Sequence, residues 1–146
     1  MDDDRTLETS VTIDAPIEEV WDALTTPDQI RRWFFGVQTE SDWTVGSELV
    51  HRGEYQGEEY EDKGTIVEIE PPRRLVHTHW SPMSGVPDEP SNYQEVTWSL
   101  ADRNGGTELT VGETNLPSDE AKATSEQGWD AALGELKRLL EDERPS

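Results

Sequence analysis

The fold of this protein is decided by its last extended segment, residues 116–143, which reads LPSDEAKATSEQGWDAALGELKRLLEDE. Ser118 is a favourable N-cap, and Asp119 and Glu120 follow where the helix dipole favours negative charge. Apolar residues then recur at helical spacing and form one stripe, made of Trp129, Ala132, Leu133, Leu136, Leu139 and Leu140. The segment therefore predicts one long amphipathic helix, roughly 36 Å in length. The strand-rich remainder of the chain needs this helix to close a core.

The composition indicates a folded but strongly acidic protein. The chain has 146 residues, a size that favours one domain with a hydrophobic core. Acidic residues number 33 against 12 basic ones, and the formal net charge is −21. Salt would screen this charge, so we expect a halophilic source. Nucleic-acid binding is disfavoured, because a phosphate backbone needs a basic face and the sequence offers none.

Other features of the composition restrict the compartment and the chemistry. The chain has no cysteine, which excludes disulfides, thiolate metal sites and a cysteine nucleophile. It has no apolar run long enough for a membrane span or a signal peptide. We therefore expect a cytoplasmic protein with no membrane partner. We expect a single domain over residues 1–146, with residues 1–4 disordered and the folded core at residues 5–142.

Upstream of the long helix, the sequence predicts one strand, two short helices and a run of antiparallel strands. The alternation of apolar and polar residues predicts a first strand over residues 5–14. Glu18 begins the first helix, and residues 28–34 form the second, which ends at Gly36. Residues 37–45 are left unassigned. Further strands are predicted at residues 48–52, 58–70, 74–80, 92–101 and 107–111, with residues 53–57 as a hairpin connection. The result is an α+β fold with about six antiparallel strands.

Several short pieces of sequence occur in the order seen in a known family. They are APIEEVWDALT at 15–25, RWF at 32–34, VG at 45–46, PPRR at 71–74, GGTELT at 105–110, and GW at 128–129 ahead of Leu133 and Leu136. From Val11 to Leu140 the chain resembles the activator of heat-shock-protein-90 ATPase homologue family of the START-like, birch-allergen-like (SRPBCC) superfamily. The resemblance implies a helix-grip fold, in which a curved antiparallel sheet wraps the C-terminal helix and leaves a cavity between them.

The chain also departs from the pattern of that family. Family members usually carry a second glycine where Ser47 stands, often an aromatic residue at His77 and His79, and a histidine at Glu113. These differences imply a more polar cavity than is typical. The eukaryotic co-chaperones of the family carry a separate N-terminal domain, which this chain lacks, and this weighs against a chaperone role.

His77-Thr78-His79 is the sharpest local feature. On a strand, both imidazoles would point to the same face as Leu75. With His51 from another strand they could ligate Zn²⁺ or Fe²⁺. We prefer the alternative, in which these histidines are hydrogen-bonded in a polar cavity wall or face solvent, and we expect no metal and no cofactor.

Aromatic residues supply the remaining candidates for a ligand site. In folds of the resembled family the cavity opens where the second short helix ends, at Trp33 and Phe34, although ordinary core is the alternative for every such residue. Gly128 beside Trp129 would let the sheet approach or leave room for a ligand. The expected ligand-binding residues are Trp33, Phe34, His51, His77, His79, Trp98, Trp129 and Leu133. Four acidic residues are expected to form only a solvated hairpin, namely Glu58, Glu59, Glu61 and Asp62.

Three functions fit this sequence. We prefer the binding of a small apolar or amphipathic ligand between the sheet and the helix. The second is an enzyme of the polyketide cyclase or aromatase type, which requires His77 and His79 to face the cavity with a carboxylate such as Glu113. The third is a co-chaperone-like module that binds a protein partner through an exposed apolar patch.

Overall fold

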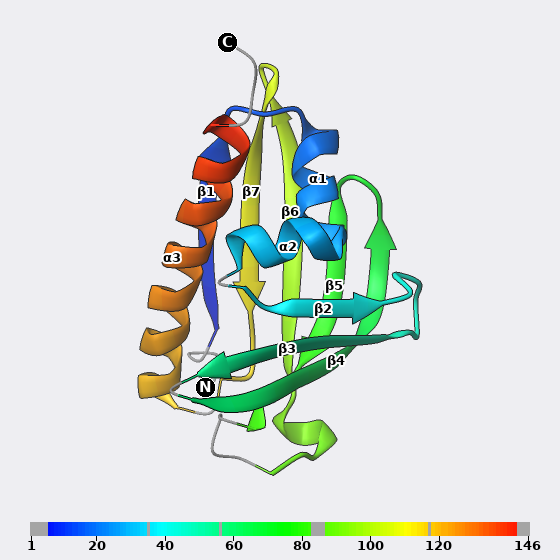
Figure 1. Cartoon of the computed structure of the whole chain (residues 1–146), viewed down its shortest axis with the longest axis vertical. Helices are drawn as coiled ribbons and strands as arrows, with labels where there is room; N and C mark the ends of the chain where they lie inside the picture. The colour runs from blue at the N-terminus through cyan, green and yellow to red at the C-terminus, as the bar shows by residue number, and fades with distance from the viewer. Residues whose placement is uncertain (1–5, 35, 56, 83–86, 117, 143–146) are drawn as a thin grey trace.

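The computed structural model describes residues 6–34, 36–55, 57–82, 87–116 and 118–142, and the expected disorder of residues 1–4 lies outside these ranges. The described elements follow one another in the order that the sequence predicts, which confirms the α+β class (Figure 1). In chain order they are β1 (Leu7–Ile13), α1 (Ile17–Thr25), α2 (Pro27–Trp33), β2 (Gln38–Ser41), β3 (Glu48–Tyr55), β4 (Glu58–Glu70), β5 (Arg74–His79), the 3-10 helix η3 (Pro90–Asn92), β6 (Gln94–Arg103), β7 (Gly106–Glu113) and α3 (Asp119–Asp142).

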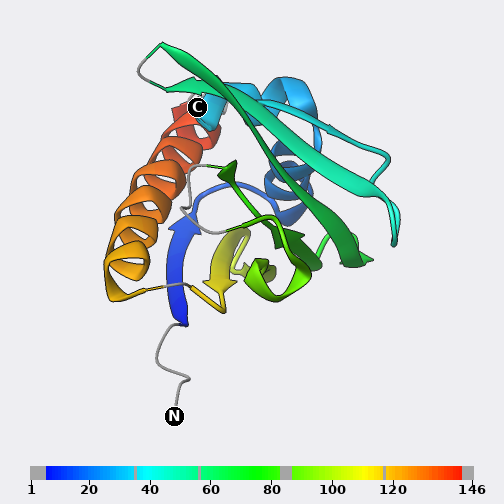
Figure 2. The ribbon, with the colours of Figure 1, turned by 90° about the horizontal axis from the view of Figure 1, so that it is seen from below.

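The strands form one antiparallel sheet, which confirms the expected helix-grip fold. Its order is β1-β7-β6-β5-β4-β3-β2, so β1 and β2 are the two edges among the described strands. The β3–β4 hairpin runs across the direction of the other long strands (Figure 1). The end-on view in Figure 2 shows the sheet curling around the helices. None of the described helices is both long and apolar enough to cross a bilayer.

The curvature of the sheet is concentrated in β4, which pairs with β3 in its first half and with β5 in its second. The register shifts between Ile66 and Glu68, as expected for a β-bulge that bends a strand. A side chain on Gly64 would place its Cβ 1.8 Å from the carbonyl oxygen of Thr78, so only glycine allows β5 to approach this closely. The bend turns the β3–β4 hairpin over the face that holds the helices.

The long C-terminal helix forms as its sequence predicts. The backbone N–H of Ala121 donates to Oγ of Ser118 at 3.0 Å, which confirms Ser118 as the N-cap. The apolar stripe faces the sheet, with Ala132, Leu133, Leu136 and Leu140 buried and Trp129 and Leu139 partly buried. This stripe is the part of the core that joins the first and last elements of the chain, because α3 packs against β1.

The structure corrects the prediction around the β2–β4 edge. β2, at residues 38–41, has no clear strand pattern in the sequence, because only one of its four side chains, Thr39, is buried. β3 continues to Tyr55, three residues beyond its predicted end, so that most of the predicted connection at 53–57 is strand. Gly53 indicates a turn in the sequence, but in the sheet it makes room for the ring of Tyr60, whose Oη would lie 2.5 Å from an added Cβ. The sheet therefore has seven described strands rather than about six.

Candidate ligand-binding cavity

A largely apolar cavity of about 230 Å³ lies between the sheet, α2 and α3. Each layer of the fold contributes to its wall, because β3, β4, β5 and β6 turn alternate side chains toward the helices. The lining residues are Leu24, Ile30, Trp33, Phe34, Trp43, Leu49, His51, Asp62, Leu75, His77, His79, Val96, Trp98, Glu113, Ser125, Gly128 and Trp129. The cavity thus has an aromatic body and a smaller set of polar groups.

The aromatic side chains form a connected wall. Trp98 contacts both Trp33 and Trp129 edge to face, with ring centroids 6.2 Å and 5.2 Å apart. Phe34 lies 6.5 Å from Trp129 with the two rings nearly parallel, at 4°. The indole N–H of Trp33 donates to the carbonyl of Ala23 at 2.8 Å and holds that ring in place. Edge-to-face contacts between aromatic rings stabilise a protein by more than the area they bury. The contacts among these rings therefore stabilise the cavity wall.

His77 is held in one uncharged form by its two hydrogen bonds. Its Nδ1 lies 2.9 Å from the carbonyl oxygen of Thr78, which can only accept, so Nδ1 carries the proton. Its Nε2 lies 3.1 Å from the indole Nε1 of Trp98, which can only donate, so Nε2 is the acceptor. Burial lowers the pKa of His77 to about 4, in agreement with a neutral ring. Neither ring nitrogen of His77 is available to a metal or to a substrate.

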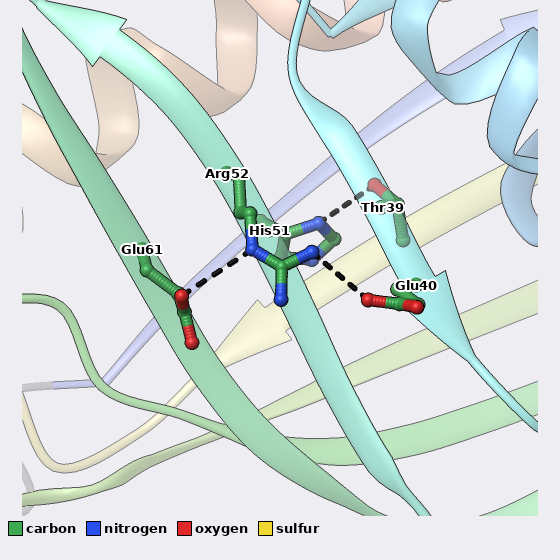
Figure 3. Close-up of polar contacts among 5 residues, drawn as sticks. All are labelled: Thr39, Glu40, His51, Arg52 and Glu61. Atoms are coloured by element: carbon green, nitrogen blue, oxygen red, sulfur yellow. Dashed lines mark hydrogen bonds and ion pairs between the residues drawn. The ribbon is translucent and has the colours of Figure 1, made fainter.

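His51 is positioned by the edge strand. Its Nδ1 lies 2.9 Å from the hydroxyl of Thr39 on β2 (Figure 3). Burial, followed by the nearby His77 and His79, lowers the pKa of His51 to about 3. Figure 3 also shows the next residue, Arg52, whose guanidinium contacts Glu40 on β2 and Glu61 on β4 at 2.9 Å and 3.3 Å. β2 is thus held by one contact at the cavity and one at the exposed surface.

Asp62 is a cavity residue that sequence reasoning missed. It pairs in register with His51 across β3 and β4, so both side chains point to the same face of the sheet. Its Oδ2 lies 3.8 Å from Nε2 of His79. Burial raises the pKa of Asp62 to about 6 and lowers that of His79 to about 4, so at neutral pH the carboxylate is charged and the imidazole is not. The sequence indicates the position of Asp62 only through the two-residue period of a strand. Asp62 lies an even number of positions before Gly64 and Ile66, so it shares their face of β4.

Glu113 places a second carboxyl group at the polar end of the cavity. It is 5% exposed and accepts a hydrogen bond from the indole Nε1 of Trp129 at 3.0 Å. Ser125 on α3 also hydrogen-bonds this carboxyl group, whose pKa is nevertheless raised by burial. His79, Glu113 and Ser125 line a second, more polar cavity of about 380 Å³ toward the start of α3. These three residues therefore lie between an aromatic cavity and a polar one.

The structure brings seven of the eight predicted ligand-binding residues to the aromatic cavity, namely Trp33, Phe34, His51, His77, His79, Trp98 and Trp129. Leu133 instead lies in the hydrophobic core, 1% exposed, and does not line the cavity. The histidines do face the cavity with Glu113, as the enzyme hypothesis requires. Among the residues that the structure describes, no three His, Asp or Glu side chains are placed to hold one metal ion.

A curved antiparallel sheet closed on a long helix, with an aromatic cavity between them, defines a helix-grip protein of the START-like class. Within that class, the chain belongs to the family described as Activator of Hsp90 ATPase homolog 1-like protein, which it matches over residues 14–141. A search of curated proteins found no match.

Solved structures agree with this assignment. The solution structure of ChR145 from Cytophaga hutchinsonii is 38% identical, with a TM-score of 0.83 and 98% of both chains covered. The crystal structure of CalU16 from Micromonospora echinospora is 28% identical, with a TM-score of 0.75, over 92% of this chain and 75% of that one. DynU16, a protein in the dynemicin biosynthetic locus, is 26% identical, with a TM-score of 0.79, over 97% of this chain and 49% of that one.

Proposed function

We propose that this protein binds a small apolar or amphipathic molecule in the aromatic cavity. The observation that carries the proposal is the wall itself, in which Trp98 contacts both Trp33 and Trp129 beside about 230 Å³ of space. Apolar pockets with a few placed polar groups are the usual form of small-molecule sites, which span roughly 300–1,000 Å³. This cavity is smaller than that range, so the ligand that fits it has an apolar body of one or two rings.

The relatives support a small-molecule role. DynU16 is a protein of a biosynthetic locus, and it shares the fold of this chain at 26% identity. The described residues expose only two large hydrophobic side chains, Val45 and Val67, and these do not make the apolar patch that a co-chaperone-like module would need. Ligand binding is therefore the function that the arrangement supports best.

The indole N–H signals of the six tryptophans provide a residue-specific test. Unlabelled naphthalene-based ligands would be titrated into ¹⁵N-labelled protein in 1 M KCl. We expect the signals of Trp33, Trp98 and Trp129 to move and those of Trp21 and Trp80, which do not line the cavity, to stay in place. If a broad panel of apolar molecules leaves all six signals unmoved, the proposal fails. Native mass spectrometry of freshly purified protein would show any molecule that it carries.

A second candidate is a cyclase-like enzyme, and one contact favours it. His79 and Asp62 form a pair of titratable groups 3.8 Å apart in a water-poor cavity, and either could accept a proton from a bound substrate. His77 cannot take this role, because both of its ring nitrogens are occupied. The catalytic histidine of this version is therefore His79 rather than the predicted pair.

The enzyme version is tested on any molecule found to bind. Turnover would appear as a change in mass of that molecule during incubation with the wild-type protein. We expect His79→Gln to abolish the change while binding persists, and His77→Gln to act only through stability. A bound molecule that is recovered unchanged would contradict the enzyme version and leave the binding function in place.

A further inference from the structure

The polar groups of the aromatic cavity share one property, which is that they accept hydrogen bonds or carry negative charge. Among the described residues, no Lys or Arg side chain lines the aromatic cavity or the polar cavity beside it. The histidines are neutral at pH 7, because burial lowers their pKa values to about 3 for His51 and about 4 for His77 and His79. The ionisable oxygens that line the aromatic cavity belong to Asp62 and Glu113.

Asp62 holds an acceptor that lacks a donor. Its side chain is 16% exposed, and its Oδ1 is buried without a hydrogen-bond partner in the described part of the chain. Ser81 hydrogen-bonds the same carboxylate, and His79 lies 3.8 Å from Oδ2, which is beyond hydrogen-bond range. A buried carboxylate oxygen in this state is unfavourable unless a donor reaches it. Asp62 is a residue of the cavity wall, so a ligand there can supply a donor to its carboxylate.

Glu113 adds a second acceptor to the wall of the aromatic cavity. Its Oε1 takes the indole N–H of Trp129, which leaves the carboxylate oriented by α3. Trp98, Trp129 and Phe34 line the same cavity. Aromatic faces attract cations, and the attraction grows when water is excluded.

We propose that the cavity selects ligands that join an apolar ring body to a protonated amine, with the ammonium group donating to Asp62. This deepens the proposed ligand-binding function and rests on it. The same arrangement rejects ligands that end in a carboxylate or phosphate, because the buried carboxylate of Asp62 repels them and no Lys or Arg among the described residues of the cavity wall compensates.

Three probes with the same ring system but different head groups show how much the head group contributes to the affinity. They are 1-naphthylmethylamine, 1-naphthalenemethanol and 1-naphthoic acid, titrated at pH 7.5 into the full chain. The titrations use 1 M KCl, where the Debye length of about 3 Å removes the general attraction of an acidic surface for cations. We expect the amine to bind at least tenfold more tightly than the alcohol, and the acid to show no binding.

Variants then assign the selectivity to named residues. Asp62→Asn should weaken amine binding about tenfold and leave alcohol binding unchanged, and Glu113→Gln should act in the same direction. Asp22→Asn is the control, since it removes one exposed carboxylate from α1, away from the cavity. Equal affinity of the amine and the alcohol would overturn this inference while the binding function stands. No binding by any of the three probes would overturn both.

Discussion

The indole Nε1 of Trp98 donates a hydrogen bond to Nε2 of His77 across 3.1 Å, from β6 to β5 inside the cavity wall. This contact determines the chemistry of the whole cavity, because it fixes one histidine as a neutral structural residue. The titratable groups of the cavity wall that remain are His51, Asp62, His79 and Glu113.

The first prediction concerns the tautomer of His77. We expect the ¹⁵N spectrum of His77 to show a protonated Nδ1 and an unprotonated Nε2 at pH 7, because the two partners of the ring allow no other form. The same signals should stay unchanged between pH 8 and pH 5, since burial lowers the pKa of His77 to about 4. A protonated Nε2, or titration near pH 6.5, would contradict the assigned hydrogen bonds.

The second prediction is that filling the cavity at Gly128 stabilises the protein while it blocks binding. Nothing lies within 4 Å of a Cβ added to Gly128, and this residue lines the cavity. Gly128→Ala should raise the free energy of unfolding by about 0.5–1 kcal/mol, as expected for replacing glycine inside a helix. Gly128→Leu should bring its side chain into the cavity and reduce probe affinity at least tenfold. Urea unfolding and probe titration measure the two effects.

Gly134 provides the matched control for this pair of variants. It lies on the same helix, is exposed, has the same free space around its Cβ, and does not line the cavity. Gly134→Ala and Gly134→Leu should stabilise to a similar degree without changing probe affinity. Loss of affinity in both series would show that the effect comes from the helix and not from a filled cavity.

The third prediction concerns acid. Because the pKa values of His51, His77 and His79 are lowered in the folded state, the unfolded chain binds more protons below about pH 6.5. The free energy of unfolding should therefore fall as the pH drops from 6.5 toward 4, by up to about 1.4 kcal/mol per pH unit for each histidine. Asp62 opposes part of this loss, because its pKa is raised to about 6 and the folded state takes up its proton first.

Urea unfolding in 1 M KCl at pH 7, 6 and 5 measures this dependence with surface repulsion screened. His79→Gln should make the dependence shallower by removing one of the three groups. Stability that rises as the pH falls through this window would show that the histidines are not buried in neutral form.

The fourth prediction concerns salt and follows from the net charge of −21. At 0.01 M salt the Debye length is about 30 Å, longer than the radius of a domain of this size, so most surface carboxylates repel one another. At 1 M it is about 3 Å and only neighbours interact. The unfolded chain is more expanded and suffers less repulsion, so the melting temperature should rise steeply between these conditions. KCl and NaCl should act alike, and a flat melting temperature would contradict the expected adaptation to salt.

Local sequence determined the elements that carry their own signals. The stripe from Trp129 to Leu140 needs only helical periodicity to define α3, and Ser118 caps it through a bond to a residue three positions away. The extent of β4, from Glu58 to Glu70, was predicted without error, because turn signals bound it on both sides. The pairing of His77 with His79 on one face also followed from the two-residue period of a strand.

Only the tertiary structure decided which residues pack against each face of these strands and of the helix. Strand periodicity shows that Asp62 shares a face with Gly64 and Ile66, but it does not show which face is concave or that the bulge in β4 turns this one over the cavity. The neutral state of His77 depends on Trp98, which is 21 residues away along the chain. The raised pKa of Asp62 depends on its burial in the folded protein. Polarity and spacing are local properties, whereas desolvation and hydrogen-bond partners come from residues that folding brings together.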